Sequence, residues 1–355
     1  MNRTVLVTGA TGIVGSNLVR ALLDSAYNVR VLIRGGSDLR GLYGLPVDHY
    51  YGDVLEPATV ASAAKGCSVV FHAAAVFSYW GHEAANQLDL AVRGTRNVVR
   101  AAQQSGATRV IVTSSSVVFG SRAGECVLDE TAEFCEPNAS AYTLSKVQQE
   151  QAAFASGSKF GVEVVAVCPT LVVGPFDYRL SPSNAYIVNY LNDPFRSTFG
   201  GGCNIVSARD VGVGHVLAAE KGRSGSRYIL GSENLSWREV HELISDLTGT
   251  FGPSLRLNNM TSYLAALAAE VSARIMDTAP MVTRDEAKMS ARFYWYAHKE
   301  IAKLGFAPMA ARQALAEAIA WLIHRSYIAH SVMERLTLCP EVCDARDVYT
   351  QGTYT

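Results

Sequence analysis

Near its N-terminus the chain reads Thr4-Val5-Leu6-Val7-Thr8-Gly9-Ala10-Thr11-Gly12-Ile13-Val14-Gly15. The first five of these residues are mostly apolar and β-branched, which predicts a short buried strand of a parallel sheet. From residue 13 to residue 24 the apolar residues recur at helical spacing, which predicts a helix directly after the turn. Three glycines spaced Gly-x-x-Gly-x-x-Gly between a strand and a helix indicate a turn that binds a dinucleotide.

Each glycine of this turn has its own physical role. Gly9 permits the tight turn, Gly12 lets a diphosphate approach the backbone, and Gly15 lets the helix pack closely on the strand. The diphosphate would lie at the helix N-terminus, where backbone N–H groups and the helix dipole favour an anion. Thr11 and Ile13 belong to the same turn, so we include them among the expected cofactor-binding residues.

The rest of the first half alternates strands with helical segments. Further apolar strands are expected at 29–33, 69–72, 109–113 and 162–167, with a helix over 92–103. This alternation predicts βαβ units with right-handed crossovers, and therefore an α/β fold with a Rossmann-type, doubly wound parallel sheet.

After Pro169 the pattern changes. We expect a Rossmann domain over 1–170 with contributions from about 205–232, a smaller and mostly helical substrate-binding region, and a polar, irregular tail over 331–355. The substrate-binding region comprises 171–204 and 233–330. Within the second half, a helix capped by Asp210 is expected to run to about Glu220. A strand is expected over 227–230, and a helix with a capping box formed by Ser236 and Glu239.

Composition restricts the class of protein. The 355 residues are 49% hydrophobic and 18% charged, which is typical of a globular chain of about two structural units. With 31 Lys+Arg against 32 Asp+Glu there is no basic excess, so a general nucleic-acid binder is not expected. The seven scattered cysteines do not form a disulfide framework. We expect no signal peptide, no membrane-spanning segment and a cytoplasmic location.

The end of the second strand bears on cofactor choice. An acidic residue about 20 positions after the glycine turn would bind the ribose hydroxyls of NAD, but Arg34 stands 19 residues after Gly15. A guanidinium can pair with the 2′-phosphate of NADPH, and Arg40 could assist. We therefore expect NADPH in preference to NADH, with NADH as the alternative.

Two further motifs carry catalytic chemistry. In Tyr142-Thr143-Leu144-Ser145-Lys146, the tyrosine and the lysine stand at i and i+4 and share one face of a helix. A nearby cation favours the phenolate, so we expect Lys146 to lower the pKa of Tyr142. Directly after an expected strand stand Ser114, Ser115 and Ser116, where a hydroxyl could bond a substrate oxygen.

Together and in this order, the motifs resemble the extended short-chain dehydrogenase/reductase family, in its dihydroflavonol 4-reductase-like and 3β-hydroxysteroid dehydrogenase-like branch. The resemblance covers about residues 4–325. Supporting segments are Gly52-Asp53-Val54, His72-Ala73-Ala74-Ala75, Gly94-Thr95-Arg96-Asn97-Val98, Cys168-Pro169-Thr170 and Leu304-Gly305-Phe306-Ala307-Pro308. One departure is Ala91, where the family often has an asparagine that supports a proton relay.

The resemblance implies roles for single residues. Asp53 and Val54 would contact the adenine. Ala73, Ala74 and Ala75 would line the cofactor, and Pro169 and Thr170 would lie against the nicotinamide. Ser115, Tyr142 and Lys146 would be catalytic, with Lys146 also bonding the ribose. Aromatic side chains are expected to line the substrate pocket: Phe77, Tyr79, Trp80 and Tyr186.

We expect an enzyme that interconverts a ketone and a secondary alcohol on a hydrophobic small molecule, such as a steroid-like compound, a secondary metabolite or a 3-keto acid. A nucleotide-sugar epimerase is the alternative, although Arg34 and the apolar pocket residues count against it. A sugar dehydratase would need an acidic pair where Ser115 and Ser116 stand, and a non-enzymatic regulator would be expected to lack the tyrosine or the lysine.

No metal site is expected, because Cys339 and Cys343 have no further ligand nearby. The resemblance also implies a homodimer through the helices around 92–103 and 142–155.

Overall fold

The computed structural model describes residues 3–74, 82–136, 139–278, 280 and 282–350. Its larger sheet has seven strands in the order β11-β7-β5-β4-β1-β2-β3, and every neighbouring pair is parallel. The strands are β1 (Thr4–Thr8), β2 (Asn28–Ile33), β3 (Val47–Tyr51), β4 (Val69–His72), β5 (Arg109–Thr113), β7 (Glu163–Pro169) and β11 (Arg227–Leu230). The Rossmann-type, doubly wound parallel sheet expected from the sequence is confirmed.

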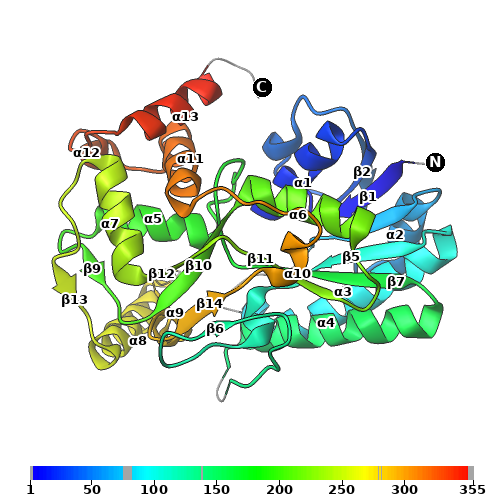
Figure 1. Ribbon diagram of the computed structural model, residues 1–355, viewed down its shortest axis with the longest axis horizontal. Coiled ribbons are helices and arrows are strands. Elements are labelled where there is room, and N and C mark those ends of the chain that lie inside the picture. Colours follow the sequence, from blue (N-terminus) through cyan, green and yellow to red (C-terminus); the bar gives the residue numbers. More distant parts are fainter. Residues whose placement is uncertain (1–2, 75–81, 137–138, 279, 281, 351–355) are drawn as a thin grey trace.

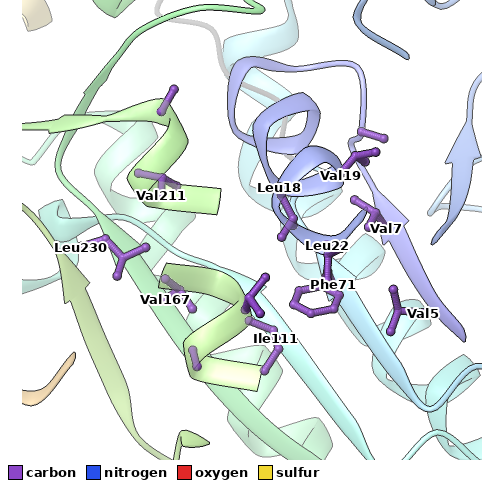
Figure 2. Packing of buried hydrophobic residues seen from close by; sticks show 14 of the residues in the cluster. Val5, Val7, Leu18, Val19, Leu22, Phe71, Ile111, Val167, Val211 and Leu230 are labelled. Atoms are coloured by element: carbon purple, nitrogen blue, oxygen red, sulfur yellow. The ribbon is translucent and has the colours of Figure 1, made fainter. Parts of the chain in front are cut away.

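Helices cover both faces of this sheet (Figure 1). On one face lie α1 (Ile13–Asp24) and α6 (Ala208–Lys221), and on the other α2 (Pro57–Ala64), α3 (His82–Ser105) and α4 (Ala141–Phe160). In Figure 2 the side chains of Leu18 and Leu22 from α1 and Val211 from α6 lie over strand residues such as Phe71 and Ile111. These side chains are almost completely buried, so the hydrophobic effect fixes α1, and with it the glycine turn, against the sheet.

A second lobe is built around a smaller sheet (Figure 1). Its strands are β6 (Val127–Leu128), β8 (Leu171–Val173), β10 (Gly202–Ser207), β12 (Glu233–Ser236) and β14 (Phe293–Tyr296). A two-stranded sheet joins β9 (Ser197–Thr198) to β13 (Leu255–Arg256). The helices of this lobe are α5 (Pro182–Asn192), α7 (Trp237–Thr248), α8 (Asn259–Met276), α9 (Arg284–Ser290), α11 (Ala311–His324), α12 (His330–Met333) and α13 (Pro340–Thr350). Helix α10 (Lys299–Ala302) instead packs on β11 and α6, and its Ile301 belongs to the core of the larger sheet.

Several local expectations are confirmed. The first strand and helix have the expected bounds, the strand over 227–230 forms, and α7 begins with the expected capping box between Ser236 and Glu239. The cap of α6 was predicted wrongly. Ser207 accepts the capping hydrogen bond, and Asp210 instead lies in the first helical turn and accepts the backbone N–H of Met309.

Two further expectations for the second half are wrong. Residues 293–296 form strand β14 within a stretch expected to be mostly helical. The C-terminal stretch is not irregular, because α13 packs on α11 and buries Val342 completely. In the part of the chain that the structure describes, no helix has the length and apolar character required to cross a membrane.

Candidate active site

The glycine turn has the geometry of a dinucleotide site. Gly9 has a φ of +73°, and a Cβ there would lie 2.5 Å from the backbone nitrogen of Ala74. At Gly15 a Cβ would lie 2.1 Å from the carbonyl oxygen of Gly9, so this position requires glycine for packing. At Gly12 the nearest protein atom would be 3.7 Å away. Packing within the protein does not require a glycine at position 12, whereas close approach of a ligand does.

Helix α1 starts at this turn without a side-chain cap and without an acidic residue in its first turn. Gly12 is the N-cap residue, and Ile13 is the first residue of the helix. The backbone N–H groups of the first turn therefore point toward the place where the diphosphate would lie, and the residues present fit a dinucleotide.

The ends of β1 and β4 are tied together beside the turn. The Thr8 hydroxyl bonds Nδ1 of His72 at 2.9 Å, and Nε2 of His72 bonds the Thr95 hydroxyl of α3 at 3.0 Å. Burial lowers the pKa of His72 to about 3, so the ring is neutral and serves as a structural bridge. The backbone nitrogens of Ala73 and Ala74 donate to the carbonyl and the hydroxyl of Thr8. Ala75 lies outside the described residues.

A cavity of about 460 Å³ lies at the end of β2. It is lined by Arg34, Gly35, Gly36, Ser37, Gly52, Asp53, Glu56 and Arg179. Arg34 therefore stands where the sequence placed it. Arg40 does not line the cavity. Its guanidinium pairs with both oxygens of Asp38, and this hydrogen bonding holds the pKa of that carboxyl at about 2.

The segment after β3 is also held in place. Asp53 closes a local turn by accepting the backbone N–H of Leu55 at 2.9 Å. The carbonyl oxygen of Val54 accepts a hydrogen bond from the Asn97 amide of α3 at 3.0 Å. Asp53 lines the same cavity as Arg34, so the structure brings together the residues expected at the adenosine end.

The three adjacent serines after β5 have different surroundings. Ser115 interacts with the phenol of Tyr142. Ser116 interacts with Tyr296, whereas the buried Ser114 hydroxyl lies near Glu150 and Cys168 and makes no hydrogen bond of normal geometry to either. The structure thus pairs Tyr142, at the start of α4, with Ser115, which is the serine that the family pattern indicates.

Lys146 lies one turn along α4 from Tyr142, and only 5% of its surface is exposed. Its ammonium donates to the carbonyl oxygen of Thr113 at 3.1 Å and to Oε1 of Gln149 at 3.0 Å. Burial lowers its pKa to about 8, while the acidic groups of Cys168 and Glu150 act in the opposite direction. Gln149 was not singled out from the sequence, although its i+3 spacing from Lys146 places it on the same helix face.

The expected effect of Lys146 on Tyr142 is not found. Burial raises the pKa of Tyr142, and the hydrogen bond with Ser115 only partly offsets this rise. The ammonium is directed at Thr113 and Gln149, so desolvation of the phenolate outweighs attraction to the cation. At neutral pH the phenol is therefore protonated and can act as a proton donor.

A buried ion pair lies behind Lys146. Glu150, 2% exposed, pairs with Arg227 of β11 at 2.7 Å, and the thiol of Cys168 lies 3.6 Å from its other oxygen. Burial raises the pKa of Glu150, and Arg227 lowers it. This pair joins α4 to the far edge of the sheet and was not identified from the sequence.

The remaining expected residues have various positions. Pro169 is buried at the end of β7, and the Thr170 hydroxyl donates to Asn204 at 2.9 Å. Tyr186 of α5 is partly buried, its hydroxyl bonds Nε2 of His241 on α7, and its ring packs on Trp237 with 4.7 Å between centroids. Phe77, Tyr79 and Trp80 lie outside the described residues.

Within the described ranges no group of three or more His, Cys, Asp or Glu could hold a metal ion.

Comparison with known proteins is consistent with this geometry. A Synechocystis sp. protein named "Putative dihydroflavonol 4-reductase" is 34% identical over 331 residues, covering 91% of this chain and 95% of that protein. Sterol demethylase protein B of Methylococcus capsulatus is 30% identical over 338 residues, covering 92% and 100%. The crystal structure of gox2253 has 34% identity and a TM-score of 0.81, covering 92% of this chain and 100% of that one.

The family model described as "NAD dependent epimerase/dehydratase family" matches residues 5–231, which include the glycine turn, the three serines, and Tyr142 with Lys146. This protein therefore belongs to the NAD-dependent epimerase/dehydratase family, within the extended short-chain dehydrogenases/reductases, and is an NAD(P)-dependent oxidoreductase.

Proposed function

We propose that this protein is an NADPH-dependent reductase of a ketone on a hydrophobic small molecule. The observation that carries the proposal is the placement of Tyr142. Its buried phenol interacts with Ser115, and Lys146 lies one helical turn along α4. A phenol that carries its proton at neutral pH, with a second hydroxyl beside it, is placed to donate that proton to a carbonyl oxygen as the carbonyl is reduced.

A bound nicotinamide dinucleotide supplies the hydride in this chemistry. As the carbonyl carbon is reduced, Tyr142 transfers its phenolic proton to the developing alkoxide oxygen. Ser115 donates a hydrogen bond to the same oxygen and stabilises the charge where it develops. Lys146 places a positive charge on the same face of α4 one turn away, and a proton from solvent restores the phenol.

The second lobe, most of which comes from residues 171–204 and 233–330, is proposed to bind the substrate. Tyr186, Trp237 and Tyr190 form an aromatic cluster around the buried His241, on helices α5 and α7. Tyr190, Trp237 and His241 are buried in the core of this lobe, so the preference for a hydrophobic compound over a charged sugar nucleotide is proposed from the named relatives. The names of two relatives, a dihydroflavonol reductase and a sterol demethylase protein, refer to hydrophobic substrates of those proteins.

The first experiment tests cofactor and reaction together. Purified protein would be denatured and assayed for released NAD, and binding of NADPH and NADH would be compared by fluorescence. Arg34→Ala is expected to weaken NADPH binding about tenfold and to leave NADH binding nearly unchanged, because a charge-assisted pair is lost. Tyr142→Phe is expected to bind NADPH normally and to lose ketone reduction on a panel of apolar ketones.

The opposite result would favour the epimerase. Protein that arrives with tightly held NAD, and whose cofactor binding ignores Arg34→Ala, would contradict the proposal. Sugar nucleotides would then be tested for epimerisation before any further ketone.

A further inference from the structure

We infer that Arg179, which the second lobe contributes, is the second arginine of the site for the 2′-phosphate of NADPH and helps determine cofactor specificity. The inference rests on the proposed function, because it requires NADPH to be the preferred cofactor. Arg179 lies in a segment rich in Tyr, Pro, Ser and Asn that offers no motif, and only the tertiary structure brings it to the cofactor side.

Arg179 and Arg34 line the same cavity of about 460 Å³. Arg34 follows β2, whereas Arg179 comes from the stretch between β8 and α5. Nη2 of Arg179 donates to the Thr11 hydroxyl at 2.9 Å, which anchors the side chain beside the glycine turn. The two guanidinium groups thus approach one cavity from two different lobes.

The segment that presents Arg179 is rigidly held by both lobes. From the Rossmann side, Ser16 donates to the carbonyl of Phe176 at 3.0 Å and Asn17 to that of Pro175 at 2.9 Å. From the second lobe, Trp321 donates to the carbonyl of Asp177 and Tyr327 to that of Tyr178, at 3.2 Å and 2.8 Å. Four successive carbonyls immediately before Arg179 are therefore bonded by side chains.

This segment also stores backbone strain on both sides of Arg179. Phe176 has a φ of +63° and Leu180 a φ of +52°, and both are bulky residues in the left-handed region. Such conformations cost about 1–3 kcal/mol each and persist only where the surroundings enforce them. A strained and heavily bonded segment that ends in an arginine at a cavity is consistent with a preorganised ligand contact.

The charge of the cavity explains why a second arginine is needed. Asp53 and Glu56 line it as well, so Arg34 alone would face two carboxylates and the lining would repel a dianionic phosphate. Arg179 supplies the compensating charge. A guanidinium has five N–H donors, and Thr11 takes one of them, so donors of the fork remain for phosphate oxygens.

The test is titration calorimetry of the full chain with NADP⁺ and NAD⁺, and with 2′,5′-ADP and 5′-AMP as fragments. Arg179→Ala is expected to weaken NADP⁺ and 2′,5′-ADP about tenfold and to change NAD⁺ and 5′-AMP less than about twofold. Arg179→Lys keeps the charge but lacks the fork and should be intermediate. Arg238→Ala, an exposed arginine of α7 paired with Glu242, is the matched control and should change neither affinity. Melting temperatures of all variants report whether each is folded.

Each other outcome overturns the inference in a recognisable way. An equal loss of NADP⁺ and NAD⁺ binding in Arg179→Ala would make Arg179 a contact of the diphosphate. A selective loss in Arg34→Ala with none in Arg179→Ala would refute the role of Arg179 and leave the proposed function intact. Equal affinity of the wild type for NADP⁺ and NAD⁺ would refute the NADPH preference itself, and with it this inference.

Discussion

Ser114, Ser115 and Ser116 show how strongly function depends on single residues at this site. They are adjacent in sequence and chemically identical, yet each hydroxyl has different surroundings. Ser114 lies near Glu150, Ser115 interacts with Tyr142, and Ser116 interacts with Tyr296. Ser115 is the N-cap of a short 3-10 helix, Ser116–Phe119, and the change of backbone conformation there separates the three hydroxyls. Position in the fold, and not residue type, distinguishes the serine beside the phenol.

This difference predicts the effect of removing each hydroxyl. Ser115→Ala should lower kcat for ketone reduction about 10²-fold, because one hydrogen bond to the developing alkoxide is lost. Ser116→Ala, one residue further on, should change kcat only slightly. Steady-state assays and NADPH titrations of both variants provide the measurement, and equal effects of the two changes would contradict the assignment.

The lowered pKa of Lys146 predicts that the activity of the enzyme depends on pH. Its pKa is lowered to about 8, so the ammonium loses its proton as the pH rises through that value. We expect kcat/KM for NADPH, measured at saturating ketone, to fall above about pH 8, because the positive charge near Tyr142 and the cofactor site disappears. In Lys146→Arg the cation does not titrate in this range, so an unchanged inflection near pH 8 in that variant would assign it to another group.

The glycine turn allows a paired prediction. Gly15→Ala should destabilise the fold by about 3 kcal/mol, because its Cβ would overlap the carbonyl oxygen of Gly9. Gly12→Ala should melt near the wild-type temperature, since Gly12 has a φ of −86° and no protein atom within 3.4 Å of the added Cβ. Its NADPH affinity should nevertheless fall at least about tenfold, because the methyl group occupies the path of the diphosphate. Thermal denaturation and cofactor titration separate the two effects.

Among the elements, α13 was least expected, because its stretch reads as polar and irregular. Its inner face is nevertheless part of the second-lobe core, with Val342 and Tyr349 packed near Trp321 of α11 and Phe176. Phe176 belongs to the strained segment that presents Arg179. Helix α13 therefore contacts that segment through the rings of Tyr349 and Phe176.

Two valines of α13 test this packing. Val342 is completely buried, so Val342→Ala should lower the free energy of unfolding by about 1–2 kcal/mol through lost apolar burial and a small cavity. Val348→Ala, where the side chain is 39% exposed, should change it by less than about 0.5 kcal/mol. Urea denaturation of both variants is the measurement. Equal and negligible effects would mean that α13 does not contribute to the core in solution.

At the scale of the whole molecule, three buried neutral histidines among the described residues connect elements that lie far apart in sequence. His72 joins β1 to α3, His215 joins α6 to β5 through Thr113, and His241 joins α7 to α5. Burial lowers their pKa values to about 3, about 4 and about 3 respectively. In the unfolded chain each returns to its ordinary value of 6.5, so the unfolded state binds more protons below that pH.

The sign of the effect follows directly. The contribution of these histidines to the free energy of unfolding is fully present above pH 6.5 and is lost as the pH falls toward 4. Between pH 7.5 and 5.5 the loss is about 1 kcal/mol per histidine. Denaturant unfolding at these two pH values should show this decrease. His215→Gln removes one titrating group and should reduce the difference between the two pH values, even if its stability at pH 7.5 is lower. An unchanged difference would show that His215 is not the source.

What the sequence predicts well is local. The β-branched run before Gly9, the spacing of three glycines and the helical repeat after them are short-range patterns, so the Rossmann sheet and the glycine turn could be inferred without coordinates. The i, i+4 spacing of Tyr142 and Lys146 is equally local, because helix geometry alone places the two side chains on one face. The family follows from these patterns taken in order.

Tertiary structure decided everything that depends on contacts between distant segments. Arg179 reaches the cavity of Arg34 from the second lobe, which could not be read from residue types. The pairing of Arg40 with Asp38, two residues away, is by contrast a local contact. The pKa of Tyr142 is raised because burial of the phenol outweighs a cation whose hydrogen bonds go elsewhere. Burial and long-range pairing are properties of the folded chain, and they set the protonation states and the charge of the cavity beside Arg34.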